Sequence, residues 1–162
     1  MRLATHVLAL LMLLALTAAA SAAELRGQVV GVHDGDTLTL LTSEREQARI
    51  RLAEIDAPET RQPWGTRARQ ALAAMAYQKP AIVVVVDTDR YGRTVGTVWV
   101  EGRNVNAEMV RQGHAWVYRQ YLRDRSLLAV EDEARRARRG LWRLPEAERV
   151  PPWGWRRERR DR

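Results

Sequence analysis

Alternating apolar and polar positions dominate the first half of the chain and predict β-strands. Between residues 36 and 42, Leu38 and Leu40 fall on one face and the threonines on the other. The run Ala81–Val86 is continuously apolar and predicts a strand buried on both faces. The five predicted strands cover residues 24–34, 36–42, 47–55, 81–86 and 94–100.

Three segments have the 3.6-residue apolar period of a helix. They cover residues 66–78, 104–112 and 126–139. Thr66 is the expected N-cap of the first helix. In the last helix, Glu131 and Asp132 precede Arg135 and Arg136 by four residues. These two i,i+4 pairs predict a solvent-exposed charged face.

Five short strands with few helices predict an α+β fold. The expected architecture is a small closed five-stranded β-barrel with three helices packed outside it, as in an OB-fold. The barrel and its helices should occupy residues 24–144. Residues 145–162 form a separate tail rich in proline, tryptophan and arginine.

The first 23 residues have the features of a secretory signal peptide. Arg2 supplies the positive charge, Val7–Ala20 the short apolar region, and Ala20-Ser21-Ala22 a small-residue cleavage site. An uncleaved membrane anchor is the alternative, but the apolar run is short for a bilayer. We therefore expect a periplasmic or secreted protein with no stable membrane span after cleavage.

The charge of the chain suits an anionic partner. The formal net charge is +7, and loss of Arg2 with the signal would lower it to +6. Nucleic acid, an anionic membrane surface and acidic glycans all fit this charge. There is no cysteine, and only His33 and His114 lie beyond the signal, so a zinc site is not expected.

Two acidic residues lie at strand ends, where β-strand formation does not by itself explain an acid. Asp34-Gly35 is explained by a hairpin turn, in which glycine tolerates positive φ. Asp36, however, opens the second predicted strand, and Asp56 ends the third. If the strands containing them pair antiparallel, both carboxylates come to one end of the sheet. A pair of oxygen ligands without histidine or cysteine predicts Ca²⁺ or Mg²⁺.

Two arginines and a third acid complete a candidate phosphodiester site. Arg51 and Arg93 can donate paired hydrogen bonds to phosphate oxygens that gain charge in the transition state. Glu59 can accept a proton from an attacking water. Taken singly, each of these segments also has a simpler interpretation, as a turn or a solvated acid.

The motifs "DGDTLTL", "IRLAEIDAPE", "DRYGR" and "VNAEMVRQG" occur in that order, and together they resemble the staphylococcal nuclease (thermonuclease) family. The resemblance covers roughly Arg26 to Trp142. It implies an OB-fold barrel with three helices. It also implies Ca²⁺-dependent, sequence-nonspecific cleavage of single- or double-stranded DNA and of RNA, leaving 3′-phosphate ends.

The resemblance also implies roles for individual residues. Those implied to hold calcium are Asp36, Asp56 and the backbone carbonyl of Ala57; those implied to act in catalysis are Arg51, Glu59 and Arg93; those implied to contact the nucleotide are Arg90, Tyr91, Tyr118 and Tyr121. Ala57 stands where a threonine is usual, and Arg90 where a lysine is. Arg119 falls where a further tyrosine is expected, with Tyr118 one place earlier.

Two other function classes remain open at this point. One is an OB-fold module that binds nucleic acid without cutting it, although all five polar catalytic and metal side chains are present. The other is a basic structural protein of a cell wall or membrane. Two interpretations of the tail also stay open: a frayed chain end, or Trp153 and Trp155 packed on the domain with the arginines that follow extending along a nucleic-acid backbone. We expect a monomer.

Overall fold

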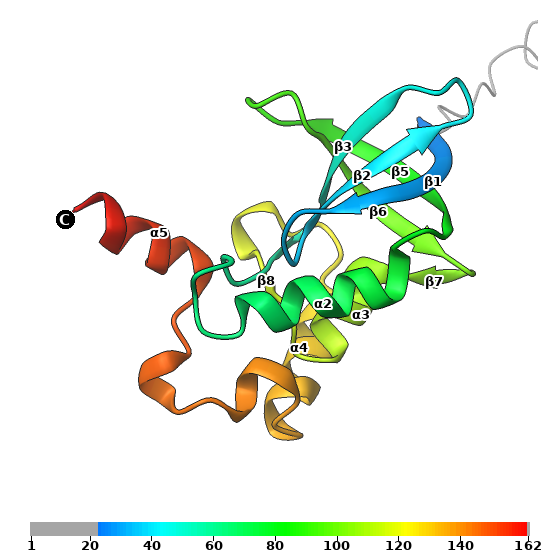
Figure 1. Ribbon diagram of the computed structural model, residues 1–162. Helices are drawn as coiled ribbons and strands as arrows, with labels where there is room; N and C mark the ends of the chain where they lie inside the picture. Colours follow the sequence, from blue (N-terminus) through cyan, green and yellow to red (C-terminus); the bar gives the residue numbers. More distant parts are fainter. Residues whose placement is uncertain (1–22, 162) are drawn as a thin grey trace, which may run out of the picture.

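The computed structural model describes residues 23–161, so the predicted signal peptide lies almost entirely outside the described residues. Its main feature is a barrel of five long strands, drawn in blue, cyan and green in Figure 1. They are β1 (Glu24–Val32), β2 (Thr37–Thr42), β3 (Gln47–Leu52), β5 (Pro80–Thr88) and β6 (Thr94–Val100). Three two-residue strands accompany them: β4 (Ile55–Asp56), β7 (Arg103–Asn104) and β8 (Trp116–Val117).

Strand pairing closes the sheet on itself. The order is β3-β2-β1-β5-β6, with antiparallel neighbours throughout. The two ends of this order then pair in parallel, with Ile50 opposite Thr94. Closure leaves these strands without a free edge. The predicted α+β barrel of the OB-fold type is therefore confirmed.

The barrel interior is filled by the apolar positions that the alternation marks. Leu38, Leu40, Ile50 and Leu52 are all at most 1% exposed. The prediction for β5 is wrong in one respect: its burial alternates, with Val83 fully buried and its neighbours partly exposed. A barrel strand has only one inward face, so the outward valines are covered only in part.

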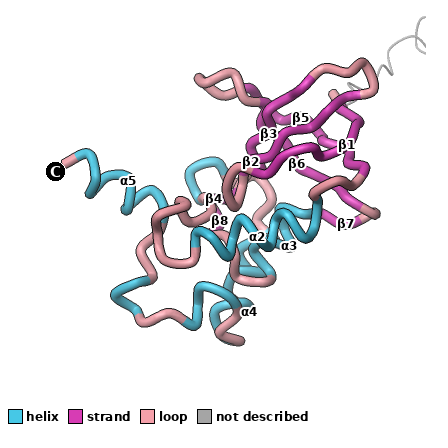
Figure 2. The backbone as a smooth tube through the Cα atoms, in the orientation of Figure 1, coloured by secondary structure: helices cyan, strands magenta, loops and turns pink. Residues whose placement is uncertain are grey.

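Helices cover one end of the barrel (Figure 2). The α-helices are α2 (Gly65–Ala76), α3 (Val105–Arg111), α4 (Ser126–Arg136) and α5 (Pro152–Arg160), and the short 3₁₀ helices are η1 (Arg119–Tyr121), η2 (Gly140–Arg143) and η3 (Glu146–Glu148). Thr66 is not the N-cap of α2: that position is Trp64, in a left-handed conformation without a side-chain cap. The bend before α2 presses Gly65 against the backbone oxygen of Glu59, where no larger residue fits. The helix therefore starts one residue before Thr66.

The charged face predicted for α4 is only partly exposed. Glu131 is fully buried and accepts a hydrogen bond from the Val117 backbone N–H at 2.8 Å. Arg119 and Arg135 pair with the same carboxylate at 2.7 and 3.2 Å. The prediction of a solvated face is thus wrong at Glu131, because the carboxylate satisfies a backbone donor of β8.

The tail adds a helix, α5, that the sequence pattern did not predict. It extends away from the barrel in red in Figure 1. Trp153 packs edge-on against Trp116 with ring centroids 6.0 Å apart, beside a second apolar cluster that contains Trp142. The expected packing of Trp153 on the domain is confirmed. Within residues 23–161, no helix is long and apolar enough to cross a membrane.

Candidate active site

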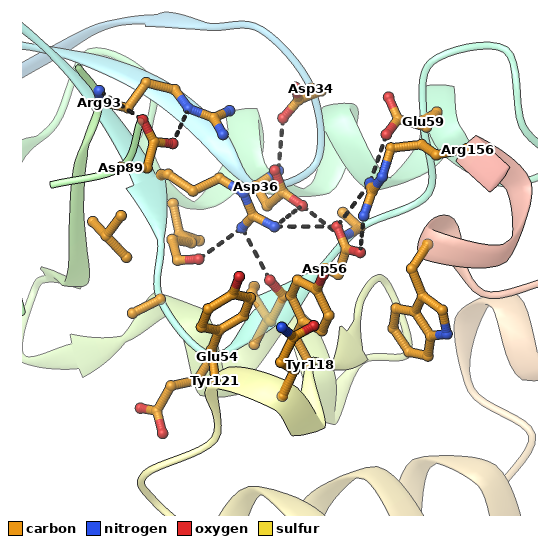
Figure 3. A pocket seen from close by; sticks show the side chains of 18 of the residues that line it. Asp34, Asp36, Glu54, Asp56, Glu59, Asp89, Arg93, Tyr118, Tyr121 and Arg156 are labelled. Atoms are coloured by element: carbon orange, nitrogen blue, oxygen red, sulfur yellow. Dashed lines mark hydrogen bonds and ion pairs between the residues drawn. The ribbon is translucent and has the colours of Figure 1, made fainter. Parts of the chain in front are cut away.

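One open cleft collects every residue to which the sequence assigns a role. Its lining includes Asp36, Arg51, Asp56, Ala57, Glu59, Arg90, Tyr91, Arg93, Tyr118 and Tyr121. Figure 3 shows many of these side chains facing a common space at the junction of the barrel and the helices. The residues come from the β1–β2 turn, β3, β4 and the segment after it, the β5–β6 loop, and the segment after β8 with η1.

The β1–β2 turn positions Asp36. His33 N–H donates to the Thr37 carbonyl, which closes the hairpin, and Asp34 accepts from the Asp36 N–H. Gly35 does not have positive φ. It is needed because a Cβ there would lie 2.6 Å from the Cβ of Ala57. The turn is thus packed tightly against the Ala57 segment, whose N–H donates to Asp36 Oδ2 at 2.6 Å.

Asp56 reaches the same place from the other side. It ends β4, which pairs antiparallel with β8, so that Asp56 lies opposite Trp116. Arg51 lies between the two acids, with its Nη2 3.4 Å from Asp36 and 3.1 Å from Asp56. Its Nη1 donates to the carbonyls of Leu52 and Ile55. Arg51 therefore fixes the backbone that carries Asp56 as well as balancing charge.

Burial makes both carboxylates costly to ionise. Asp36 is 6% exposed and Asp56 is 1% exposed. Burial raises the pKa of Asp36 to about 6, against the opposing charge of Arg51. Burial also raises the pKa of Asp56, against a hydrogen bond from Arg156, and the charge of Asp36 adds to the rise. A bound cation would favour the ionised form of both groups.

The β5–β6 loop presents Arg93 to the cleft. Its Nε donates to Asp89 Oδ2 at 2.7 Å, and Asp89 Oδ1 accepts the backbone N–H groups of Tyr91 and Arg93. The pKa of Asp89 is lowered because these hydrogen bonds outweigh its desolvation. Arg90 lies over the ring of Tyr91, which is 70% exposed. Asp89 is a functional candidate that the sequence analysis missed, although "DRYGR" contains it.

Glu59 has an unexpected partner from the tail. Arg156 Nη1 donates to Glu59 Oε1 at 2.7 Å, and Arg156 Nη2 donates to Asp56 Oδ2 at 2.6 Å. The tail arginines were expected to face nucleic acid, and Arg156 instead contacts two acids of the site (Figure 3). The spacing of the tail arginines was a possible signal, because Arg156, Arg159 and Arg160 share one face if the tail is helical. In the structure all three line the cleft.

The candidate nucleotide contacts differ in how accessible they are. Tyr121 is 59% exposed and meets the Tyr118 ring edge-on. Tyr118 also stacks nearly parallel to Trp153, with centroids 5.4 Å apart. Arg119, where a further tyrosine was expected, is tied to Glu131 instead. Base stacking is therefore open at Tyr121 and Tyr91, and partly covered at Tyr118.

The available donors fit a hard cation. Among residues 23–161, no three His, Cys, Asp or Glu side chains lie close enough together to hold a metal ion. His33 bonds to Thr39 and His114 to Trp64, so neither imidazole serves this cleft. Two buried carboxylates, supplemented by backbone and water oxygens, match the preference of Ca²⁺ or Mg²⁺. Soft or imidazole-preferring metals lack ligands here.

The chain is similar in sequence to several known proteins. The family described as "Staphylococcal nuclease homologue" matches residues 49–144. The chain is 52% identical over 151 residues to Protein ParB of Escherichia coli, covering 86% of this chain and 84% of that protein. It is 44% identical to the Micrococcal nuclease of Shigella flexneri over 83% of this chain and 82% of that protein. An uncharacterized endonuclease of Escherichia coli O157:H7 is 45% identical over 83% of this chain and 86% of that protein. The chain therefore belongs to the staphylococcal nuclease family.

Proposed function

We propose that this protein is a Ca²⁺-dependent, sequence-nonspecific nuclease that hydrolyses phosphodiester bonds of DNA and RNA. The observation that carries the proposal is the convergence of three acids and two arginines in one cleft: Asp36, Asp56, Glu59, Arg51 and Arg93. A nucleic-acid-binding module has no need for two buried, costly carboxylates at its centre. A hydrolytic site uses both the acids and the arginines.

Asp36 and Asp56 would hold the cation, with the backbone carbonyl of Ala57 as a further donor. When bound, the cation would supply charge neutralisation of the two acids and polarisation of a phosphate oxygen. The hydrogen bond from Ala57 N–H and the contact with Arg51 hold the Asp36 carboxylate in place. The carboxylates are thus fixed before substrate arrives, which limits the reorganisation needed on binding.

Glu59 is the proposed general base. Its side chain is 40% exposed, so water reaches it, and it lies at the cleft beside Asp56. A carboxylate positioned near an attacking water accepts its proton as the new bond to phosphorus forms. The bond to the 5′-oxygen then breaks; this oxygen leaves with the electron pair and takes a proton from solvent to become a 5′-hydroxyl, and the other product has a 3′-phosphate end.

Arg93 and Arg51 are the proposed stabilisers of the charged transition state. Asp89 occupies the Nε of Arg93, which leaves its terminal nitrogens for phosphate oxygens (Figure 3). Arg51 is more constrained, because its Nη groups already contact Leu52, Ile55 and both metal-site acids. Its contribution therefore combines charge with positioning of the Asp56 segment.

Substrate tolerance and location complete the proposal. The exposed Tyr91 and Tyr121 offer ring faces that any base can stack on, and arginines contact the backbone without reading sequence. The signal-like residues 1–23 support a periplasmic or secreted enzyme. We propose that it acts as a monomer.

The decisive assay is cleavage of plasmid DNA and of RNA by the purified protein, with calcium or with excess chelator. Calcium-dependent nicking of both substrates, with 3′-phosphate ends resistant to extension until dephosphorylated, is the expected result. Undiminished cutting in chelator would rule out the cation assignment. N-terminal sequencing of the exported protein tests cleavage near residue 23.

A further inference from the structure

Helix α5 places a positively charged side chain, Arg156, in the site. Arg156 makes a two-pronged contact with Asp56, through Nη2–Oδ2 at 2.6 Å and Nη1–Oδ1 at 3.2 Å. With Arg51 also on Oδ1, guanidinium groups engage both oxygens of this 1%-exposed carboxylate. Paired guanidinium–carboxylate hydrogen bonds are among the strong polar contacts of proteins.

The same helix covers two other parts of the site. Arg156 Nη1 holds Glu59 Oε1 at 2.7 Å, so this oxygen already accepts a hydrogen bond. Trp153 stacks on the Tyr118 ring and so covers a face that a base could otherwise stack on. One helix thus blocks a metal carboxylate, the proposed base and an aromatic contact.

The position of α5 is held at three separate points. Gln62, which is 5% exposed, donates to the Val150 carbonyl just before the helix and accepts from the Glu59 N–H. Trp153 packs against Trp116, and Arg156 binds the two acids. The first two contacts anchor the tail on the domain without using the acids. Only the third competes with a ligand.

We propose that α5 is an autoinhibitory element whose Arg156 takes the place of the divalent cation at Asp56, so that cation binding and docking of Arg156 exclude each other. The proposal rests on the cation assignment made above. Arg51 already contacts Oδ1 of Asp56, so Arg156 takes the remaining oxygen, Oδ2, and adds a second guanidinium to this carboxylate. Calcium ligands lie at about 2.3–2.6 Å from the ion, so a cation bound there would stand within a few ångströms of Arg156. Mutual repulsion in a poorly solvated cleft is strong at such distances.

Release of Arg156 would also make three groups of the site accessible at once. Asp56 Oδ2, Glu59 Oε1 and, if the helix leaves entirely, the covered face of Tyr118 become accessible at the same time. The displaced helix carries Arg156, Arg159 and Arg160 on one face, which suits the backbone of the nucleic acid that then enters. Cation and substrate would therefore act together to open the site.

The matched variants are Arg156→Ala and Arg157→Ala in the full chain. Arg157 is the adjacent residue of α5, is exposed, and has no ion-pair partner among residues 23–161. Both variants lose one positive charge, so they differ only in the contact to the acids. Calcium affinity is measured by isothermal titration calorimetry without nucleic acid, at moderate salt to screen long-range charge effects.

Arg156→Ala should bind calcium at least roughly tenfold more tightly than the wild-type protein, and Arg157→Ala should match the wild type. Equal calcium affinity of the two variants would overturn the autoinhibitory role while leaving the cation assignment intact. Absence of calcium binding in all three proteins would overturn both proposals.

Discussion

Asp89 and Arg93 form a linked pair in which one carboxylate shapes the loop and aims the guanidinium. Oδ1 of Asp89 accepts the backbone N–H groups of Tyr91 and Arg93 at 2.9 and 3.0 Å. Oδ2 accepts Arg93 Nε at 2.7 Å. Because each oxygen makes different hydrogen bonds, a single substitution can remove the bond to Arg93 Nε and keep those to the loop backbone.

Asp89→Asn should preserve the conformation of the loop but lose the hydrogen bond that orients the Arg93 guanidinium. The amide oxygen can still accept the two backbone N–H groups, whereas the amide NH₂ cannot accept from Nε. We expect turnover to fall roughly tenfold with native circular dichroism, less than the loss from Arg93→Ala. A double-mutant cycle checks the mechanism: with Arg93 already replaced, Asp89→Asn should cost almost nothing. Additive losses would show that Asp89 acts independently of Arg93.

Glu59→Gln should reduce cleavage at least roughly 10²-fold, the scale of a lost general base. The fold of the variant should be preserved, because Glu59 lies partly exposed at the cleft and, within residues 23–161, its carboxylate hydrogen-bonds only with Arg156. Calcium should still raise the thermal midpoint of unfolding of this variant, and that increase is a measure of cation binding. A fall of less than tenfold with a native circular dichroism spectrum would exclude Glu59 as the base.

Arg51→Ala and Arg93→Ala should each also cost at least roughly 10²-fold in rate. They should differ in stability, because Arg51 is largely buried and holds two backbone carbonyls while Arg93 lies in a loop. Urea unfolding without calcium should therefore show a clear loss for Arg51→Ala and little change for Arg93→Ala. Equal stability of the two variants would contradict the positioning role assigned to Arg51.

The sequence predicts the barrel and the centre of its site because both depend on local pattern. Alternation at Leu38 and Leu40 defines an inward face, and antiparallel pairing of Thr37 with Arg51 follows from a short connection. That pairing brings Asp36 toward the segment that carries Asp56. The resemblance then supplied the roles that pattern alone leaves open.

Other features depend on contacts between distant residues, which spacing does not encode. The i,i+4 pair of Glu131 and Arg135 is real, but only the packing of α4 on β8 reveals that Glu131 is buried. Arg156 lies 100 residues from Asp56: the spacing of the tail arginines marks one face of a helix, but nothing in the local sequence says which acids that face meets. Gly35 was attributed to positive φ, whereas the close approach of Ala57 is what requires it.

Replacement of Gly35 tests that close approach. A Cβ there would lie 2.6 Å from the Cβ of Ala57 and 2.7 Å from that of Ala68, so Gly35→Ala must push apart the turn and α2. We expect a loss of about 1–3 kcal/mol in the free energy of unfolding, as for other overpacked sites. Gly31→Ala is the control, since its nearest neighbour would be at 3.6 Å. If both variants are equally stable in urea, the packing argument for Gly35 is wrong.

Glu131→Gln tests the buried carboxylate of α4. Glutamine can still accept the Val117 N–H, but it leaves Arg119 and Arg135 without their shared counter-charge. Glu131→Ala removes the acceptor as well and leaves a buried backbone donor unpaired. Alanine should therefore destabilise the protein more than glutamine, by about 1–3 kcal/mol in the free energy of unfolding. Similar values for the two variants would show that the backbone hydrogen bond contributes little.

His114 should make stability depend on pH in a predictable direction. Its Nδ1 accepts a hydrogen bond from Trp64 Nε1 at 3.0 Å, and the two rings stack. Burial lowers the pKa of His114 in the folded protein, whereas in the unfolded chain it should be near 6.5. As pH falls below about 6.5, the unfolded chain takes up this proton first, so the free energy of unfolding decreases until the folded pKa is passed. Above about 6.5 the contribution of the neutral ring is complete.

The measurement compares the wild type with His114→Asn by urea unfolding at about pH 7.5 and about pH 5.5. Asparagine can still accept from Trp64 but does not titrate, so the wild type should lose more stability on acidification than the variant. Asp36 changes the stability of both proteins in the opposite direction to His114: its pKa is raised by folding, so its protonation on acidification favours the folded state. The relevant quantity is therefore the difference between the wild type and the variant in stability lost. An identical loss in the two proteins would show that the burial of His114 does not couple protonation to folding.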